Sequence, residues 1–240
     1  MVVKKFCRYV CTATALSALV LACTPKTVGQ TEQPDDKPIA YENLIFKQDS
    51  DYAVIPIGID AGDRARWSDV SSSKRGSTIY NLIFYNKKNN QAHLLLDRKA
   101  IVRSFKFLDE SNQENSNQET NEEKSASPQN RSILFHLVEK DTNGDEILNN
   151  QDAIVGYLSD WSGKNLKQIT PSNAQFLTWQ LDKSSNALFV EVLNDSDGDR
   201  KFTAQDETTF LRVNLEKPEM GEDIIGDNLR QKIQSILVQD

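Results

Sequence analysis

Apolar residues occur along this chain in short runs that are rich in β-branched and aromatic side chains. Polar clusters typical of turns, such as residues 86–90 and 182–186, separate neighbouring runs. Runs of this length and composition predict strands. The nine expected strands lie near Tyr52–Gly58, Ile79–Tyr85, Gln91–Leu96, Ile101–Leu108, Ser132–Glu139, Ala153–Ser159, Gln175–Leu181, Ala187–Leu193 and Thr208–Leu215. The pattern therefore predicts a mainly β fold, an antiparallel meander of about 8–10 strands.

Only the C-terminus has helical spacing. Leu229, Ile233, Ile236 and Leu237 follow the i, i+4, i+7, i+8 pattern of an amphipathic helix, and Asp227 is a candidate N-cap. A C-terminal helix is therefore expected after the last strand.

Two polar segments divide the chain. Residues 23–39 contain Pro25, Pro34 and Pro38 and predict a flexible tether. Residues 110–131 are almost wholly Ser, Asn, Gln, Glu and Thr, which bury too little apolar surface to offset the entropy of ordering, so a disordered loop is expected. The remainder, residues 40–240, is interpreted as a single β-rich domain that contains this loop.

An internal repeat is visible in three similar apolar triplets, residues 82–84, 133–135 and 187–189. Each triplet opens a unit that continues as strand, connection, strand, and the first two units then run into a further strand. The first connection is a short turn near residues 87–90, whereas the second and third are long acidic loops. The candidate chemistry lies in these two loops.

The loops, residues 141–152 and 195–206, share one pattern. Oxygen-bearing side chains stand at positions 1, 3, 5, 9 and 12, glycine stands at position 4, and an apolar residue stands at position 8. Calcium prefers six to eight oxygen ligands, which a tightly wrapped loop can supply from alternate side chains, whereas magnesium demands stricter octahedral geometry. The pattern predicts two calcium sites, with solvated acidic turns as the alternative.

This pattern resembles the calcium loop of EF-hand and dockerin proteins. The resemblance implies ligands at positions 1, 3, 5, 7 (through the backbone carbonyl), 9 and 12. In the first loop these are Asp141, Asn143, Asp145, Ile147, Asn149 and Asp152. In the second loop they are Asp195, Asp197, Asp199, Lys201, Thr203 and Asp206. Among these ligands the second loop has four carboxylates against three, so tighter binding is expected there.

The loops also depart from that family. Glu146 and Arg200 occupy position 6, where the family has glycine, so a residue with a Cβ must accept a strained turn or the turn must differ. Position 12 is aspartate, as in dockerins, and strands flank the loops instead of helices.

The first residues resemble an export signal of bacterial lipoproteins. Lys4, Lys5 and Arg8 precede a short apolar stretch that ends in residues 19–23, Leu-Val-Leu-Ala-Cys, which is similar to a lipobox. The resemblance implies cleavage after residue 22 and lipidation of Cys23, for example with palmitate; an uncleaved or ordinarily cleaved signal is the alternative. Thr24 follows the cysteine, so the resemblance implies the outer membrane, facing the periplasm, in a Gram-negative cell.

Residues 154–193 resemble the repeat of TolB-type β-propellers. The similarity consists of a strand, the turn Asp160-Trp161-Ser162-Gly163, and a downstream strand that contains Trp179. It implies a binding or scaffold role. Because only three units are visible, a propeller fragment, a β-sandwich or a closed meander is expected, not a closed propeller.

Composition limits the function further. The net charge of −7 argues against a nucleic-acid partner, which requires a clustered basic surface. Both histidines, His93 and His136, lie in predicted strands, where packed or surface roles are expected. The prediction is a non-enzymatic, calcium-binding, lipid-anchored scaffold of the cell envelope, with a protein or glycan partner. The alternatives are a hydrolase that uses paired carboxylates, and a calcium sensor, which requires a bistable element.

Overall fold

The computed structural model describes residues 39–59, 78–108 and 131–237. Residues Lys37–Asp240 form one compact unit. The predicted signal, almost all of the tether and nearly the whole polar loop lie outside the described residues. Ile39, placed at the end of the tether by the sequence, is instead the first residue of a strand, where it pairs with Ile59. Within the described part of the chain, no helix combines the length and apolar character needed to cross a bilayer.

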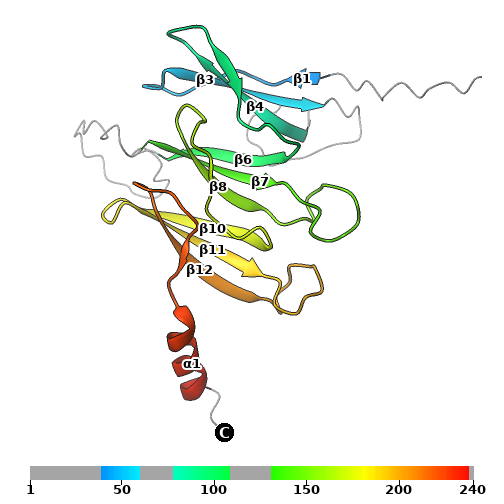
Figure 1. Cartoon of the computed structure of the whole chain (residues 1–240), viewed down its shortest axis with the longest axis vertical. Coiled ribbons are helices and arrows are strands. Elements are labelled where there is room, and N and C mark those ends of the chain that lie inside the picture. The colour runs from blue at the N-terminus through cyan, green and yellow to red at the C-terminus, as the bar shows by residue number, and fades with distance from the viewer. Residues whose placement is uncertain (1–38, 60–77, 109–130, 238–240) are drawn as a thin grey trace, which may run out of the picture. The chain divides into compact units, whose positions relative to one another are not determined.

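Three antiparallel sheets make up the fold (Figure 1). The N-terminal sheet contains β1 (Ile39–Tyr41), β2 (Ile45–Phe46), β3 (Tyr52–Ile59), β4 (Thr78–Asn86) and β5 (Ala92–Leu94). The middle sheet contains β6 (Ile101–Leu108), β7 (Ser132–Val138), β8 (Val155–Asp160) and β9 (Lys167–Gln168). The C-terminal sheet contains β10 (Ala174–Asp182), β11 (Ala187–Asn194), β12 (Glu207–Asn214) and β13 (Glu222–Asp223). Helix α1 (Gly226–Leu237) follows.

The mainly β prediction is confirmed, and each of the nine expected strands is present. The sequence missed β1, β2, β9 and β13, which have two or three residues each and are too short to show a period. No sheet among the described residues closes on itself, so the closed meander is not the architecture. The C-terminal helix is confirmed, although Asp227 lies inside its first turn and the helix begins at Gly226.

Two hydrophobic cores lie on opposite faces of the middle sheet. The first core contains Val54 and Phe84 from the N-terminal sheet together with Phe135 from β7. The second core contains Leu134 from β7 together with Val190 from the C-terminal sheet. Successive residues of a strand point to opposite faces of the sheet. Because both faces of β7 are buried, its odd and its even positions must both be apolar. Its nearly continuous apolar sequence is therefore the signature of a sheet that is covered on both sides.

The three repeated triplets lie on β4, β7 and β11, at equivalent places in the three sheets. Each of these strands is preceded in its own sheet by another long strand, namely β3, β6 or β10. The units read from the sequence therefore begin one strand too late. The further strand expected at the end of the first unit, β6, belongs to the next sheet.

The turn after β8 joins the N-terminal and middle sheets. Asp160 accepts hydrogen bonds from the backbone N–H of Ser162 (2.8 Å) and from Asn165 Nδ2 (2.8 Å). Gly163 has a φ of 76°, and a Cβ at this position would overlap the ring of Phe84 in the first core. Trp161 is buried and packs edge-on against Phe107, with ring centroids 5.6 Å apart. Glycine is therefore required here both by backbone conformation and by close packing.

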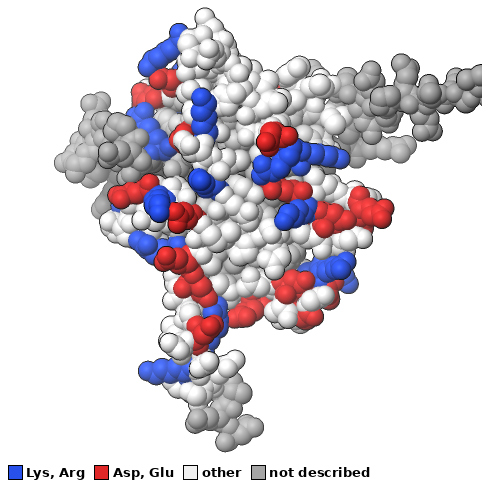
Figure 2. Space-filling model, viewed as in Figure 1, with Lys and Arg blue, Asp and Glu red and all other residues white. Residues whose placement is uncertain are grey.

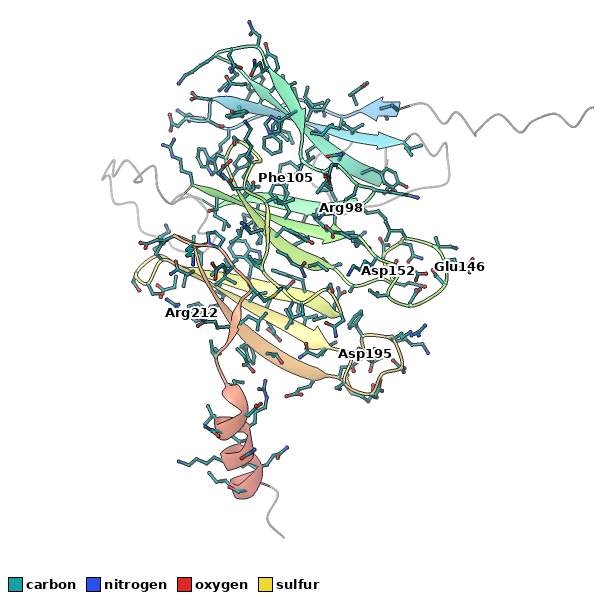
Figure 3. The ribbon with its side chains drawn as sticks, viewed as in Figure 1. Arg98, Phe105, Glu146, Asp152, Asp195 and Arg212 are labelled. Carbon is teal, nitrogen blue, oxygen red and sulfur yellow. The ribbon has the colours of Figure 1, made fainter. Side chains whose placement is uncertain are left out.

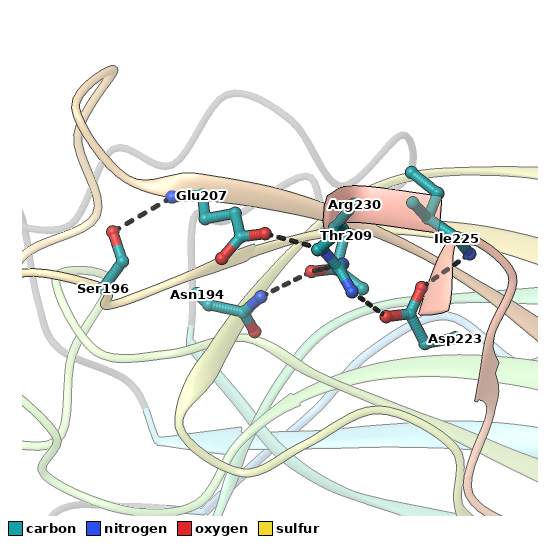
Figure 4. A network of polar contacts seen from close by, with 7 residues as sticks. All are labelled: Asn194, Ser196, Glu207, Thr209, Asp223, Ile225 and Arg230. Atoms are coloured by element: carbon teal, nitrogen blue, oxygen red, sulfur yellow. Dashed lines mark hydrogen bonds and ion pairs between the residues drawn. The ribbon is translucent and has the colours of Figure 1, made fainter. Parts of the chain in front are cut away.

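Helix α1 buries none of its side chains. Arg230 ties its first turns to the C-terminal sheet, with Nη1 2.5 Å from Asp223 and Nε 2.9 Å from Glu207 (Figure 4). Asn194 Nδ2 donates to Thr209 Oγ1 beside this ion pair, at 2.7 Å. The helix is thus held by polar contacts, while Ile233 and Leu237 remain exposed.

Candidate functional site

The two acidic loops connect β7 to β8 and β11 to β12, so they occupy the same place in two successive sheets. Their backbones match. Position 4 is glycine with a φ of 79° in Gly144 and 75° in Gly198, and position 6 has a φ of 64° in Glu146 and 65° in Arg200. A residue with a Cβ therefore does accept the left-handed conformation at position 6 in both loops, which costs roughly 1–2 kcal/mol each time. Two copies of the same strained conformation indicate a constrained loop shape.

The hydrogen bonds within the loops also correspond position by position. In each loop the N–H of position 5 donates to the side chain at position 3, and the N–H of position 7 donates to the side chain at position 5. The first loop has Asp145 N to Asn143 Oδ1 (2.9 Å) and Ile147 N to Asp145 Oδ1 (2.8 Å). The second loop has Asp199 N to Asp197 Oδ1 (3.0 Å) and Lys201 N to Asp199 Oδ1 (2.8 Å). The side chains at positions 3 and 5 are thereby fixed against the backbone two residues further along each loop.

Position 12 closes each loop. Asp152 and Asp206 are buried, and in each the two carboxylate oxygens accept N–H groups from positions 2 and 9. The distances are 2.7 and 2.9 Å from Thr142 and Asn149 in the first loop, and 2.9 and 2.8 Å from Ser196 and Thr203 in the second. The backbone N–H groups of Thr203 and Ser196 lower the pKa of the Asp206 carboxyl group. These aspartates therefore clamp the ends of the loop.

The second loop gathers its negative charge. One carboxylate oxygen from each of Asp195, Asp197 and Asp199 lies within 4.8 Å of the others. Asp195 Oδ1 is inaccessible to solvent and has no hydrogen-bond partner. Like charges at this separation repel, and an orphaned buried oxygen is destabilising, so a cation between the three groups would relieve both effects. The donor set, carboxylate oxygens only, suits a hard divalent ion.

The first loop satisfies its oxygens internally. Asn143 Nδ2 and Asn149 Nδ2 each donate to Asp145 Oδ2 at 3.2 Å. Asp141 accepts the backbone N–H groups of Gly144 (2.6 Å) and Glu146 (2.7 Å). Rotation of the two side-chain amides would replace these N–H donors with carbonyl oxygens, as a cation requires. The first loop therefore has hydrogen-bond partners for these carboxylates, whereas Asp195 Oδ1 in the second loop has none.

Of the twelve predicted ligands, the structure thus gathers Asp195, Asp197 and Asp199 into one cluster. The other predicted ligands of the second loop are not members of this cluster. Among them, Thr203 Oγ1 donates to Gln205 Oε1 at 2.7 Å. Cys23 lies outside the described residues.

The histidines are packed within strands. His93 stacks on Phe84 with ring centroids 5.7 Å apart. His136 Nδ1 lies 2.7 Å from Ser104 Oγ, and its ring contacts that of Phe176 at 4.2 Å. Burial lowers the pKa of His136 from 6.5 to about 4. The neutral imidazole is therefore part of the packing between the middle and C-terminal sheets.

A polar network that the sequence did not reveal surrounds Glu139. Its Oε1 accepts a hydrogen bond from Arg98 Nη2 (2.6 Å), and its Oε2 accepts one from Tyr157 OH (2.9 Å). Burial, reinforced by Glu139, raises the pKa of Tyr157 to about 12. The network borders an open groove of about 480 Å³ lined by Leu94 and Leu166. No sequence signal marks it, because its three members come from distant segments.

These features define a class: a three-sheet antiparallel β protein with a pair of equivalent acidic hairpin loops. Comparisons of the chain with family models, with curated proteins and with solved structures gave no match.

Proposed function

We propose that this protein is a calcium-stabilised, lipid-anchored β scaffold of the cell envelope with a non-enzymatic role. The observation that supports calcium most directly is the gathering of Asp195, Asp197 and Asp199, with one buried oxygen of Asp195 left without a partner. The matching backbone of the first loop supports a second site of the same kind.

In the second site Asp195, Asp197 and Asp199 would hold the ion, together with the Lys201 carbonyl and Thr203. Bound calcium would neutralise the charge of the loop and link its two ends. Asp206 holds the loop closed from the core side, so binding couples to the ordering of the connection between β11 and β12.

In the first site Asp141, Asn143 and Asp145 would contribute ligands, with the Ile147 carbonyl and Asn149, while Asp152 holds the loop closed as Asp206 does in the second. Binding there must first break the amide contacts to Asp145. We therefore rank the second site as the tighter one, which agrees with its larger number of carboxylates at ligand positions.

The anchor and the location rest on the lipobox-like residues 19–23. Acylation of Cys23 would tether the folded unit to a membrane, the outer membrane in a Gram-negative cell. There the sheets would present a rigid surface to an envelope protein or glycan partner. Mass spectrometry of the chain from a cell envelope fraction tests this part, because an unmodified Cys23 would contradict it.

Calcium titration with the metal alone tests the metal sites. We expect Asp195→Asn to abolish the tighter binding event in calorimetry and Asp141→Asn to abolish the weaker one. Asp97→Asn is the matched control, since its side chain is 95% exposed and lies in neither loop. Equal losses in the two loop variants would contradict the ranking. A melting midpoint unchanged by excess EDTA would remove calcium from the proposal.

A further inference from the structure

The outer face of the N-terminal sheet, which points away from the first core, has apolar residues on every strand, with the polar Asn81 opposite Ile57. Residues directly opposite each other in an antiparallel pair point to the same face. Ile55 pairs with Ile83, and Ile83 pairs with Leu94, which gives one apolar row. Tyr41 pairs with Ile57, and Phe46 pairs with Ala53, which extends the face to both short strands. These residues form the outer face.

The side chains on the short strands are the most exposed of this set, while Ile55, Ile57 and Ile83 are half-buried. The exposed fractions are 66% for Tyr41, 64% for Phe46 and 54% for Leu94. A sheet with one solvated face normally alternates apolar and polar residues. Strand β3 instead reads Tyr-Ala-Val-Ile-Pro-Ile-Gly-Ile, the composition of a strand that is covered on both sides.

The opposite end of the fold gives a contrast. On the outward side of the C-terminal sheet, Phe189 pairs with Arg212, and Phe210 pairs with Glu191. Charged and apolar residues therefore alternate there, as on an ordinary solvated sheet. The outer face of the N-terminal sheet lacks this alternation of charged and apolar residues. Exposed apolar patches of this kind mark interaction sites.

The short distance along the chain between Cys23 and β1 indicates what the outer face binds. Strand β1 begins at Ile39, and fifteen residues, 24–38, separate it from Cys23. A linker of this length spans at most about 50 Å. If Cys23 carries lipid, as in the proposed function on which this inference rests, the outer face stays close to the bilayer. Its effective concentration there is in the millimolar range, so even weak affinity keeps it docked.

Charge agrees with this choice. The described residues 39–59 and 78–100 carry five Lys and Arg against four Asp and Glu, whereas residues 131–237 carry eleven against eighteen. The first group is therefore almost neutral, with a net charge of +1, whereas the second has a net charge of −7, so an anionic lipid surface repels the second group and not the first. Figure 2 shows acidic side chains gathered around the two loops. Tyrosine and other aromatic rings also favour the membrane interface.

We propose that the outer face of the N-terminal sheet docks on the surface of the lipid bilayer to which Cys23 tethers the chain. The folded unit is then oriented by two attachments, the acyl chain and the sheet. The acidic loops belong to the part of the chain that the lipid surface repels.

The test uses the mature chain from residue 23 with Cys23→Ser, so that no acyl chain contributes. Its partitioning is measured by flotation with vesicles of phosphatidylcholine containing a minority of phosphatidylglycerol. We expect measurable binding, reduced about tenfold by the double substitution Tyr41→Ser and Phe46→Ser. The matched control is Leu177→Ser with Phe210→Ser, two exposed apolar residues of the C-terminal sheet, which should bind as the parent does.

Three results would overturn the inference: no binding by the parent chain, equal binding by the outer-face variant, or an equal loss in the control. A parent dimer that becomes monomeric in the outer-face variant without vesicle binding would assign the face to a second copy of the chain instead. Calcium titration of the same samples and the acylation state of Cys23 in cells are measured separately. The proposed function can therefore stand or fall independently of this result.

Discussion

Arg200, at position 6 of the second acidic loop, lies over Gly144, at position 4 of the first. A Cβ built on Gly144 would be only 2.8 Å from Arg200 Nη1. The two loops therefore lie side by side although a whole repeat separates them in sequence, as their labelled residues Glu146, Asp152 and Asp195 also indicate (Figure 3). The guanidinium places positive charge beside the first loop and fills the space that the glycine leaves.

This contact predicts different effects for two matched substitutions. Gly144→Ala and Gly198→Ala impose the same backbone strain, because the φ values are 79° and 75°. Only Gly144→Ala also displaces Arg200, since nothing lies within 4 Å of a Cβ at Gly198. We expect Gly198→Ala to lower the free energy of unfolding by about 1–2 kcal/mol, and Gly144→Ala by about 0.5 kcal/mol more.

Urea unfolding measures both changes, and Arg200→Ala supplies the control. In the Arg200→Ala background the two glycine variants should become equally unstable. A difference that persists there would show that the contact does not cause it.

Gly163 predicts a larger effect, because its neighbour is the ring of Phe84 in the first core. Gly163→Ala adds overpacking to backbone strain, so we expect it to lower the free energy of unfolding by about 3 kcal/mol. Gly198→Ala again serves as the comparison, with nearly the same φ and open space. Combining Gly163→Ala with Phe84→Leu should be less destabilising than the sum of the single changes. Strict additivity in urea unfolding would argue against the clash.

His136 predicts a pH dependence of stability. Its folded-state pKa of about 4 lies below its unfolded value of 6.5, so between these values the unfolded state binds more protons. Its contribution is fully present above pH 6.5 and is lost as the pH falls toward 4. The expected loss is of the order of 3 kcal/mol.

His136→Asn removes this titration while leaving every other group in place. Urea unfolding at several pH values measures the free energy of unfolding of both proteins. As the pH is lowered from 6.5 to 4, the parent should lose about 3 kcal/mol more of this free energy than the variant does. A constant difference over that range would contradict a buried neutral imidazole.

Arg230 predicts that helix α1 opens separately from the sheets. Arg230→Met removes the contacts to Glu207 and Asp223, and the helix has no buried side chain to hold it. We expect severalfold faster amide exchange across residues 226–237 with little change in the global melting midpoint. Lys232→Met, in the same helix, is the matched control and should leave exchange unchanged. A large fall in the midpoint would mean that the helix contributes to the global fold.

Much of the fold could be predicted from the sequence because long strands leave a local signal. The period and the flanking turns predict β7 and β11, whereas β9 and β13 exist only because a neighbouring strand offers hydrogen bonds. The predicted start of each repeat unit was one strand too late, for a related reason. A repeating pattern has no beginning of its own, and only pairing shows that β6 belongs to the middle sheet.

The candidate site was likewise predicted in part from the sequence and in part only from the structure. Spacing alone predicted both loops, since oxygen side chains at alternating positions are a local property of the chain. It could not show that Asp152 and Asp206 are clamps, because burial depends on the sheets beneath them. The orphaned oxygen of Asp195 and the Glu139 network were equally out of reach.

By itself, the sequence determined the strand content, the three-fold repetition, the C-terminal helix and the two acidic loops, because each depends on residues near one another in the chain. Only the tertiary structure decided that the loops are neighbours, that the middle sheet is covered on both faces and that, among the described residues, the first sheet has an exposed apolar face. Those properties depend on which surfaces meet, and packing between distant segments fixes that.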